Sequence, residues 1–138
     1  ELKQLAQTSP VLLFVEWKSP KALPELRQLV KEEKLGNRII FCSRNDGLLK
    51  DIREIEPEWT FCNGEVFQTR MFALNSLGLQ AVMKISADVF FIHLDNVKLS
   101  LEFATLVEEA KRQNKLVIIG PVTRPMKGLS PHAWLIQN

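Results

Sequence analysis

The sequence predicts an α/β fold built around a mostly parallel β-sheet. Two observations indicate this class: strand-like and helical patterns alternate along the chain, and the best strand candidates are nearly continuous apolar runs. The chain has 138 residues, of which 46% are hydrophobic and 25% are charged, as in ordinary globular domains. We therefore expect a single domain over 1–138 with a sizeable buried core.

The N-terminal part is predicted to form a strand, a helix and a second strand. The first strand covers 11–17, an apolar run bounded by prolines on both sides. Leucine and valine then recur at helical spacing until Gly36, and the prolines of this segment fall in its first turn, where a missing N–H costs little. The second strand is expected over 38–43.

The middle of the chain repeats this alternation with shorter elements. A helical segment ends at Pro57, and a short third strand is expected over 58–62. Another helical segment runs to about Gly78, beyond which residues 79–86 fit either an extension of that helix or a short strand.

The C-terminal part carries the clearest patterns. A strand is predicted over 88–94, followed by an amphipathic helix over 100–114 that Ser100 can cap. The last two strands are expected over 116–121 and 133–137. This order of elements fits both an open doubly wound sheet and part of a (β/α) barrel, and the length favours the open sheet, because full barrels have roughly 250 residues.

Composition excludes some classes of function. A net charge of +2 gives no electrostatic signature of nucleic-acid or anionic-membrane binding, and no apolar run approaches the roughly 20 residues that span a bilayer. The two cysteines, Cys42 and Cys62, lack metal-site spacing and are predicted to be buried thiols. The sequence leaves the compartment open, with the cytoplasm favoured.

Polar side chains gather where the predicted strands end. Glu16 and Lys18 point to the same side of the first strand, since side chains alternate along a strand. The carboxyl ends of parallel strands meet at one edge, so a shared pocket is expected there. Its predicted residues are Glu16, Lys18, Ser43, Arg44, Asn63 and His93. Lys18 and Arg44 make an anion such as phosphate or sulfate the expected ligand.

The order of these elements and their end residues resembles the glycerophosphodiester phosphodiesterase family. Glu16 and Lys18 match the Glu-x-Lys that ends the family's third strand, and Ser43 matches the serine of a Ser-Phe pair, with Arg44 in place of phenylalanine. Residues 98–110 resemble the helix that follows its sixth strand. The resemblance covers nearly the whole chain, although each motif alone is weak.

The resemblance implies strands three to eight of a TIM-type barrel, hence a partial or abbreviated (β/α) barrel with mostly parallel strands. The family's first two strands carry its His-Arg-Gly, Glu-x-Asp and His-Asp motifs, which include both catalytic histidines and two of its three metal-binding carboxylates. None of these motifs occurs here, and the family's Trp-Thr-x-Asn motif is also missing. No residue of the chain is therefore assigned a catalytic role.

Several site roles follow from the same resemblance. It implies that Glu16 is a ligand of a weakly held divalent metal (Mg²⁺ or Ca²⁺) and that Lys18 faces the phosphate, with Arg44 and Ser43 beside it. Asn63 and His93 would line the rest of the pocket. A carboxylate suits a hard cation, and an ammonium neutralises a phosphodiester oxygen.

The sequence supports three hypotheses of function. The favoured one is a degenerate, non-catalytic glycerophosphodiester phosphodiesterase-like domain that binds a ligand or a partner. The alternatives are the C-terminal part of an active, metal-dependent phosphoric diester hydrolase of lipid metabolism, and an unrelated α/β binding domain. The edge near 11–17 or the one near 133–137 is expected to be covered by a second copy, a partner chain or the chain's own termini.

Overall fold

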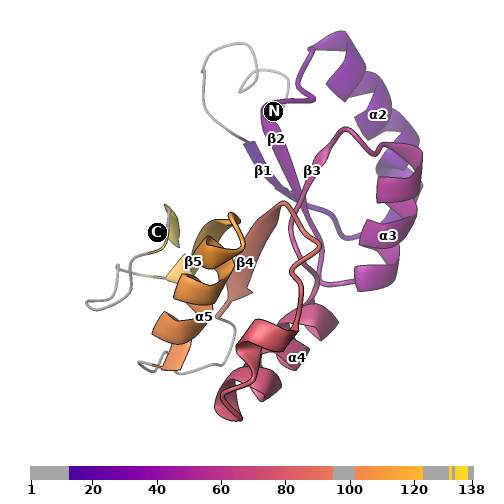
Figure 1. Ribbon diagram of the computed structural model, residues 1–138. Helices are drawn as coiled ribbons and strands as arrows, with labels where there is room; N and C mark the ends of the chain where they lie inside the picture. The colour runs from indigo at the N-terminus through magenta and orange to yellow at the C-terminus, as the bar shows by residue number, and fades with distance from the viewer. Residues whose placement is uncertain (1–12, 95–101, 123–130, 132, 137–138) are drawn as a thin grey trace.

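The computed structural model describes residues 13–94, 102–122, 131 and 133–136, which form an α/β fold (Figure 1). Its strands make two three-stranded sheets in which every pair is parallel. The first sheet contains β1 (Leu13–Glu16), β2 (Ile39–Cys42) and β3 (Thr60–Phe61). The second contains β4 (Val89–His93), β5 (Leu116–Val122) and β6 (Ala133–Ile136). The predicted α/β class with parallel strands is confirmed, and the strands follow sequence order within each sheet.

Helices connect the successive strands from β1 to β5. The α-helices are α2 (Leu23–Glu32), α3 (Asp46–Ile55), α4 (Glu65–Ser76) and α5 (Glu102–Arg112). Short 3-10 helices occur at η1 (Pro20–Ala22) and η2 (Gln80–Val82). In Figure 1, α2 and α3 lie on the same side of the first sheet, and α5 lies beside β4 and β5. Ser100 and the start of the predicted helix over 100–114 lie outside the described residues.

The segment 79–86 forms neither a strand nor an extension of α4; its only regular structure is η2. The chain leaves the helix at Gly78, whose φ of 71° lies in the left-handed region that glycine adopts without steric cost. The N–H of Leu79 donates to the carbonyl oxygen of Leu74, which satisfies one of the last carbonyls of α4. The left-handed backbone at Gly78 therefore ends α4, and a glycine after a helical pattern is a recognisable sign of a helix end.

Two apolar layers attach the helices to the outer faces of the sheets. In the first sheet, Ile39 and Phe41 of β2 pack in one cluster with residues of α2 and α3 such as Leu26 and Ile52. In the second sheet, the corresponding cluster joins α4 and α5 to alternate residues of β4 and β5: Met71, Phe90, Ile92, Phe103, Leu106, Val107, Ala110, Val117 and Ile119. Alternate strand residues thus face the helices, as the period of a strand requires.

The other face of both sheets contributes to one common apolar cluster, here called the inner cluster. Its members are Ile40, Cys42, Cys62, Val89, Phe91 and Ile118, with Phe14 and Leu116 packed against it. The rings of Phe14 and Phe91 lie edge to face with their centroids 4.8 Å apart. Because Phe14 belongs to the first sheet and Phe91 to the second, the two sheets bury their inner faces against each other.

The two cysteines are buried in the inner cluster, but the prediction of free thiols is wrong. Cys42 and Cys62 form a disulfide, with their Cα atoms 5.0 Å apart. Phe41 pairs with Phe61 in the β2–β3 ladder, and each cysteine follows one of these residues. The parallel register therefore brings together two residues that are 20 positions apart in sequence.

Side-chain amides continue the ladder where β3 ends beside β4. Direct main-chain contact is limited to a parallel bridge between Cys62 and Val89 and a hydrogen bond from Asp88 N–H to the Phe61 carbonyl, 3.0 Å. Beyond it, Asn63 Nδ2 donates to the Phe91 carbonyl (3.0 Å), and Phe91 N–H donates to Asn63 Oδ1 (2.7 Å).

Gln68 of α4 repeats this arrangement two residues further along β4. Its Nε2 donates to the His93 carbonyl (2.8 Å), and its Oε1 accepts from His93 N–H (2.9 Å). The two amides thus satisfy backbone groups of β4 that no neighbouring strand reaches.

Candidate functional site

An open pocket of about 430 Å³ lies at the carboxyl ends of β1 and β2. We call it the strand-end pocket, and its lining residues are Glu16, Trp17, Lys18, Ser43, Arg44 and Asn45. Glu16 is the last residue of β1, and Ser43 follows the last residue of β2. Four of the six residues predicted from the sequence to share a pocket therefore meet here.

The charges of the strand-end pocket centre on Glu16. Its carboxylate lies 3.5 Å from Lys18 Nζ and 3.9 Å from Arg44 Nε. These three side chains are exposed, so each contact is worth at most about 1 kcal/mol. Among the described residues that line the pocket, two cationic side chains and one carboxylate lie close together.

Hydrogen bonds hold two lining residues, Ser43 and Asn45, in the loop after β2. The Ser43 hydroxyl is buried and accepts a hydrogen bond from Asn45 N–H at 3.2 Å. Asn45 in turn caps α3, since its Oδ1 accepts from Leu48 N–H at 3.1 Å. The N-terminus of α3, which is the positive end of the helix dipole, therefore lies at the pocket.

His93 lies near the charged groups of the strand-end pocket but is not one of its lining residues. Its ring packs edge-on against Phe91, with the centroids 4.2 Å apart. Burial is the main cause that lowers its pKa, and the positive charge of Arg44 lowers it further, against the opposing effects of Glu16 and Glu65. The imidazole is thus neutral near pH 7 and adds no third positive charge.

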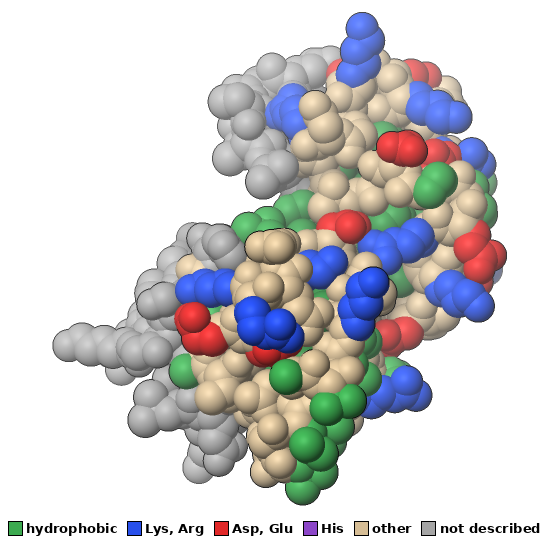
Figure 2. Space-filling view, viewed as in Figure 1, with side chains coloured by type: hydrophobic (Ala, Val, Ile, Leu, Met, Phe, Trp, Pro, Cys, Tyr) green, Lys and Arg blue, Asp and Glu red, His purple; other side chains and the backbone are tan. Residues whose placement is uncertain are grey.

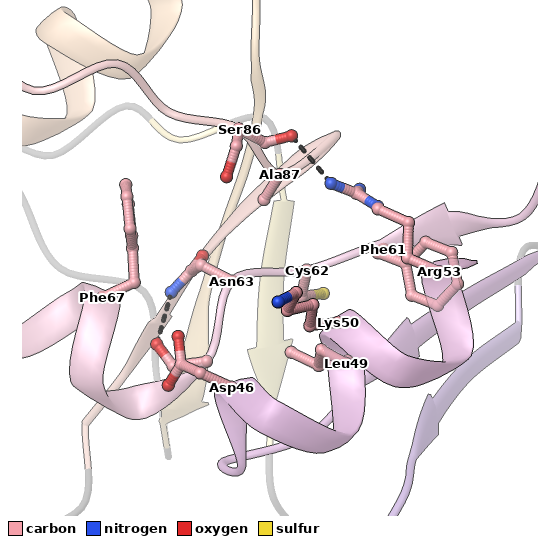
Figure 3. Close-up of a pocket in the computed structure, with 11 residues that line it drawn as sticks. Asp46, Leu49, Lys50, Arg53, Phe61, Cys62, Asn63, Phe67, Ser86 and Ala87 are labelled. Carbon is pink, nitrogen blue, oxygen red and sulfur yellow. Dashed lines mark hydrogen bonds between the residues drawn. The ribbon is translucent and has the colours of Figure 1, made fainter. Parts of the chain in front are cut away.

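Asn63 lies in a different cavity, between α3 and α4, with a volume of about 180 Å³ (Figure 3). Arg53, Asp46 and Asn63 of this cavity already have protein partners. Arg53 donates to the Ser86 carbonyl at 3.0 Å, and its guanidinium lies 2.7 Å from the Asp88 carboxylate. The Asp46 carboxylate accepts from the N–H of Val66 in the first turn of α4. We therefore assign this cavity a structural role.

The described residues do not fit a divalent metal ion. They contain no group of three His, Cys, Asp or Glu side chains that could hold one. Glu16, the predicted ligand, already contacts two cations. A hard divalent cation prefers six or more oxygen ligands, several of them from protein.

Two contributors to the site were missed in the sequence. Asn45 lines the pocket and caps α3, and an asparagine just before a helical pattern is a recognisable capping signal. Gln68 holds the backbone of His93 in place from a neighbouring helix. No sequence signal identifies Gln68, because its partner lies 25 residues away.

Comparisons with known proteins add no family assignment. No protein-family model matches the chain, and a search of curated proteins finds no match. Among the described residues, no helix combines the length and apolar character required to cross a bilayer.

Because the pKa of His93 is lowered in the folded chain, we expect the free energy of unfolding to decrease as the pH is lowered below the ordinary histidine pKa. Above the ordinary histidine pKa of about 6.5, both the folded and the unfolded chain carry a neutral imidazole. As the pH falls through that value towards the lowered folded-state pKa, the unfolded chain binds the proton more readily, and the free energy of unfolding decreases.

Urea unfolding at a series of pH values between 7.5 and 5.5, about one unit to either side of the ordinary histidine pKa, measures this effect. His93→Gln should flatten the dependence, whereas His132→Gln, which replaces the chain's other histidine, should leave it in place. Equal pH dependence in the native chain and His93→Gln would contradict the assignment.

Proposed function

We propose that this chain is a non-catalytic binding module whose strand-end pocket holds a small phosphate or sulfate ester. One observation carries the proposal: Lys18 and Arg44 line the same open pocket, and Glu16 is the only carboxylate among the described residues that line it. Charged donors bind such anions with short, strong hydrogen bonds. The adjacent start of α3 contributes a further favourable field for a negative charge.

The architecture that we propose is a partial (β/α) barrel of the glycerophosphodiester phosphodiesterase type. The sequential order of parallel strands, the helices outside and the inner cluster shared by both sheets support it. The strand-end pocket lies at the carboxyl ends of strands, where barrels of this type place their sites. The bound ester would then be related to a glycerophosphodiester.

The same residues support binding more than hydrolysis. Phosphodiester hydrolysis requires an activated nucleophile and an acid that protonates the leaving alkoxide. His93 has a lowered pKa, and its buried Nδ1 has no hydrogen-bond partner among the described residues, so no described carboxylate holds that nitrogen. The alternative is the C-terminal part of an active hydrolase, whose remaining groups come from elsewhere in a longer chain or from a partner.

Isothermal titration with glycerol 3-phosphate tests the proposal. Lys18→Gln and Arg44→Gln should each weaken binding by roughly tenfold or more, since a hydrogen bond to a charged group contributes about 1.5–3 kcal/mol. Lys21→Gln, an exposed lysine outside the pocket lining, is the matched control and should bind as the native chain does.

Glu16→Gln separates the two functions, because it acts in opposite directions. In an anion-binding module, removal of the competing carboxylate should tighten binding severalfold. In a metal-dependent hydrolase, the same change should abolish turnover of glycerophosphodiesters with added Mg²⁺, Ca²⁺ or Mn²⁺. We expect no turnover by the native chain; metal-dependent turnover that Glu16→Gln removes would refute the non-catalytic assignment.

A further inference from the structure

Three large apolar side chains are exposed at the end of α4 and in the turn that follows it. Leu77, Leu79 and Val82 are 70%, 47% and 76% exposed, and together we call them the apolar tip. A hydrogen bond from Val82 N–H to the Leu79 carbonyl closes the turn and keeps these residues together. Figure 2 shows hydrophobic side chains gathered at the lower end of this face. Such a group of exposed apolar residues marks an interaction surface more often than a single residue does.

A basic pocket adjoins the apolar tip and shares Val82 with it. This shallow hollow of about 400 Å³ is lined by Ala81, Val82, Lys84, Ile85, Arg112, Gln113 and Lys115. None of these described lining residues is a carboxylate. Arg112 is paired with Glu109 at 2.7 Å, whereas Lys84 and Lys115 form no ion pair within the described part of the chain. Figure 2 shows basic side chains across the middle of the face, above the hydrophobic ones.

Hydrogen bonds hold this surface firmly against α5. Gln113 Nε2 donates to the Met83 carbonyl (3.0 Å), and Gln113 Oε1 accepts from Ile85 N–H (2.8 Å). Gln113 also donates to Glu109, the partner of Arg112. Ile85 is fully buried. The segment that carries Val82 and Lys84 is thus anchored on both sides of Lys84, so the apolar and basic groups keep a fixed relative position.

We propose that the apolar tip and the basic pocket together dock the protein on an anionic membrane surface. The apolar side chains would enter the interfacial layer of the bilayer, and Lys84 and Lys115 would face lipid phosphates and carboxylates. A symmetric contact with a second copy would instead place these lysines near their own counterparts, which like-charge repulsion disfavours. The net charge of only +2 conceals this local imbalance of charge.

The docking surface and the strand-end pocket belong to opposite edges of the sheets. Lys84 and Lys115 precede β4 and β5, whereas the strand-end pocket follows β1 and β2. Parallel strands therefore place the two features at opposite ends. A protein docked in this way would keep its strand-end pocket open to the solvent, so the two proposals can be tested separately.

Co-sedimentation with lipid vesicles tests the inference. The native chain should bind vesicles of phosphatidylcholine mixed with phosphatidylserine, bind pure phosphatidylcholine much more weakly, and lose binding as the salt concentration rises. The double variant Lys84→Gln/Lys115→Gln should lower the partition coefficient about 25-fold, since each cation near an anionic surface contributes roughly fivefold, or about 1 kcal/mol. Leu77→Ser/Val82→Ser should lower it by roughly tenfold or more, through the loss of inserted apolar area.

Matched controls come from residues outside the apolar tip and the basic pocket. Val66→Ser replaces another exposed apolar residue, and Lys50→Gln replaces another exposed lysine; both should leave vesicle binding unchanged. Near-ultraviolet circular dichroism checks that each variant is folded. Binding that is equal for native chain and variants, or absent from both vesicle types, would overturn the inference. A dimer that Leu77→Ser/Val82→Ser dissociates, without vesicle binding by the native chain, would assign the surface to a second copy.

Discussion

Replacing Phe91 by alanine is expected to lower the free energy of unfolding by about 4 kcal/mol, because the substitution leaves a cavity in a fully buried position. Phe91 lies in the inner cluster, where its ring contacts Phe14 of the first sheet and His93 of its own strand. Urea unfolding monitored by circular dichroism measures the change. Val66→Ala, at an exposed position, should cost less than about 0.5 kcal/mol.

A double-mutant cycle shows whether the two sheets share one core. Phe14→Leu and Phe91→Leu are mild enough to keep the chain folded, and their coupling energy should be roughly 0.5–1.5 kcal/mol, as for other contacting aromatic pairs. A coupling energy near zero, together with additive losses, would mean that the two sheets do not pack through these rings.

Asn63→Ala is expected to destabilise the protein by about 3 kcal/mol, which is more than the loss of an exposed side-chain amide would cost. The substitution removes both hydrogen bonds to Phe91, whose buried N–H and carbonyl then have no partner, at a cost of roughly 1–3 kcal/mol for each group. Gln68→Ala should cost less, because its contact with His93 is only partly buried.

The matched control is Gln28→Ala, which removes an exposed amide bonded to Glu32 at 2.8 Å. That change should cost about 0.5 kcal/mol or less, as for most surface substitutions. Equal losses in Asn63→Ala and Gln28→Ala, measured by urea unfolding, would show that the side-chain amides do not hold β4 beside β3.

The sequence was informative wherever local pattern decides the structure. A strand was predicted at the position of every described strand, and most of these predictions came from apolar runs, because a strand buried on both faces has no polar alternation. Glu16, Lys18, Ser43 and Arg44 were placed together correctly, since parallel strands align their carboxyl ends at one edge. Gly78 ended α4 as a glycine after a helical pattern should.

Features that depend on pairing between distant segments were not visible in the sequence. The disulfide between Cys42 and Cys62 requires the β2–β3 register, and the role of Asn63 requires a gap in main-chain pairing that only the folded chain creates. Asn63 was accordingly expected in the strand-end pocket, whereas its side-chain amide forms hydrogen bonds with the backbone of Phe91. The basic pocket also escaped notice, since its lysines are separated by 31 positions, the difference between 115 and 84.

The most direct test of the central claim is to map where a phosphate ester binds. In ¹H–¹⁵N correlation spectra recorded during a titration with glycerol 3-phosphate, the amides of Trp17, Lys18, Arg44 and Asn45 should shift saturably, and Arg44→Gln should remove these shifts. Amide shifts confined to Lys84, Arg112 and Lys115, or shifts that Arg44→Gln leaves unchanged, would contradict anion binding by the strand-end pocket.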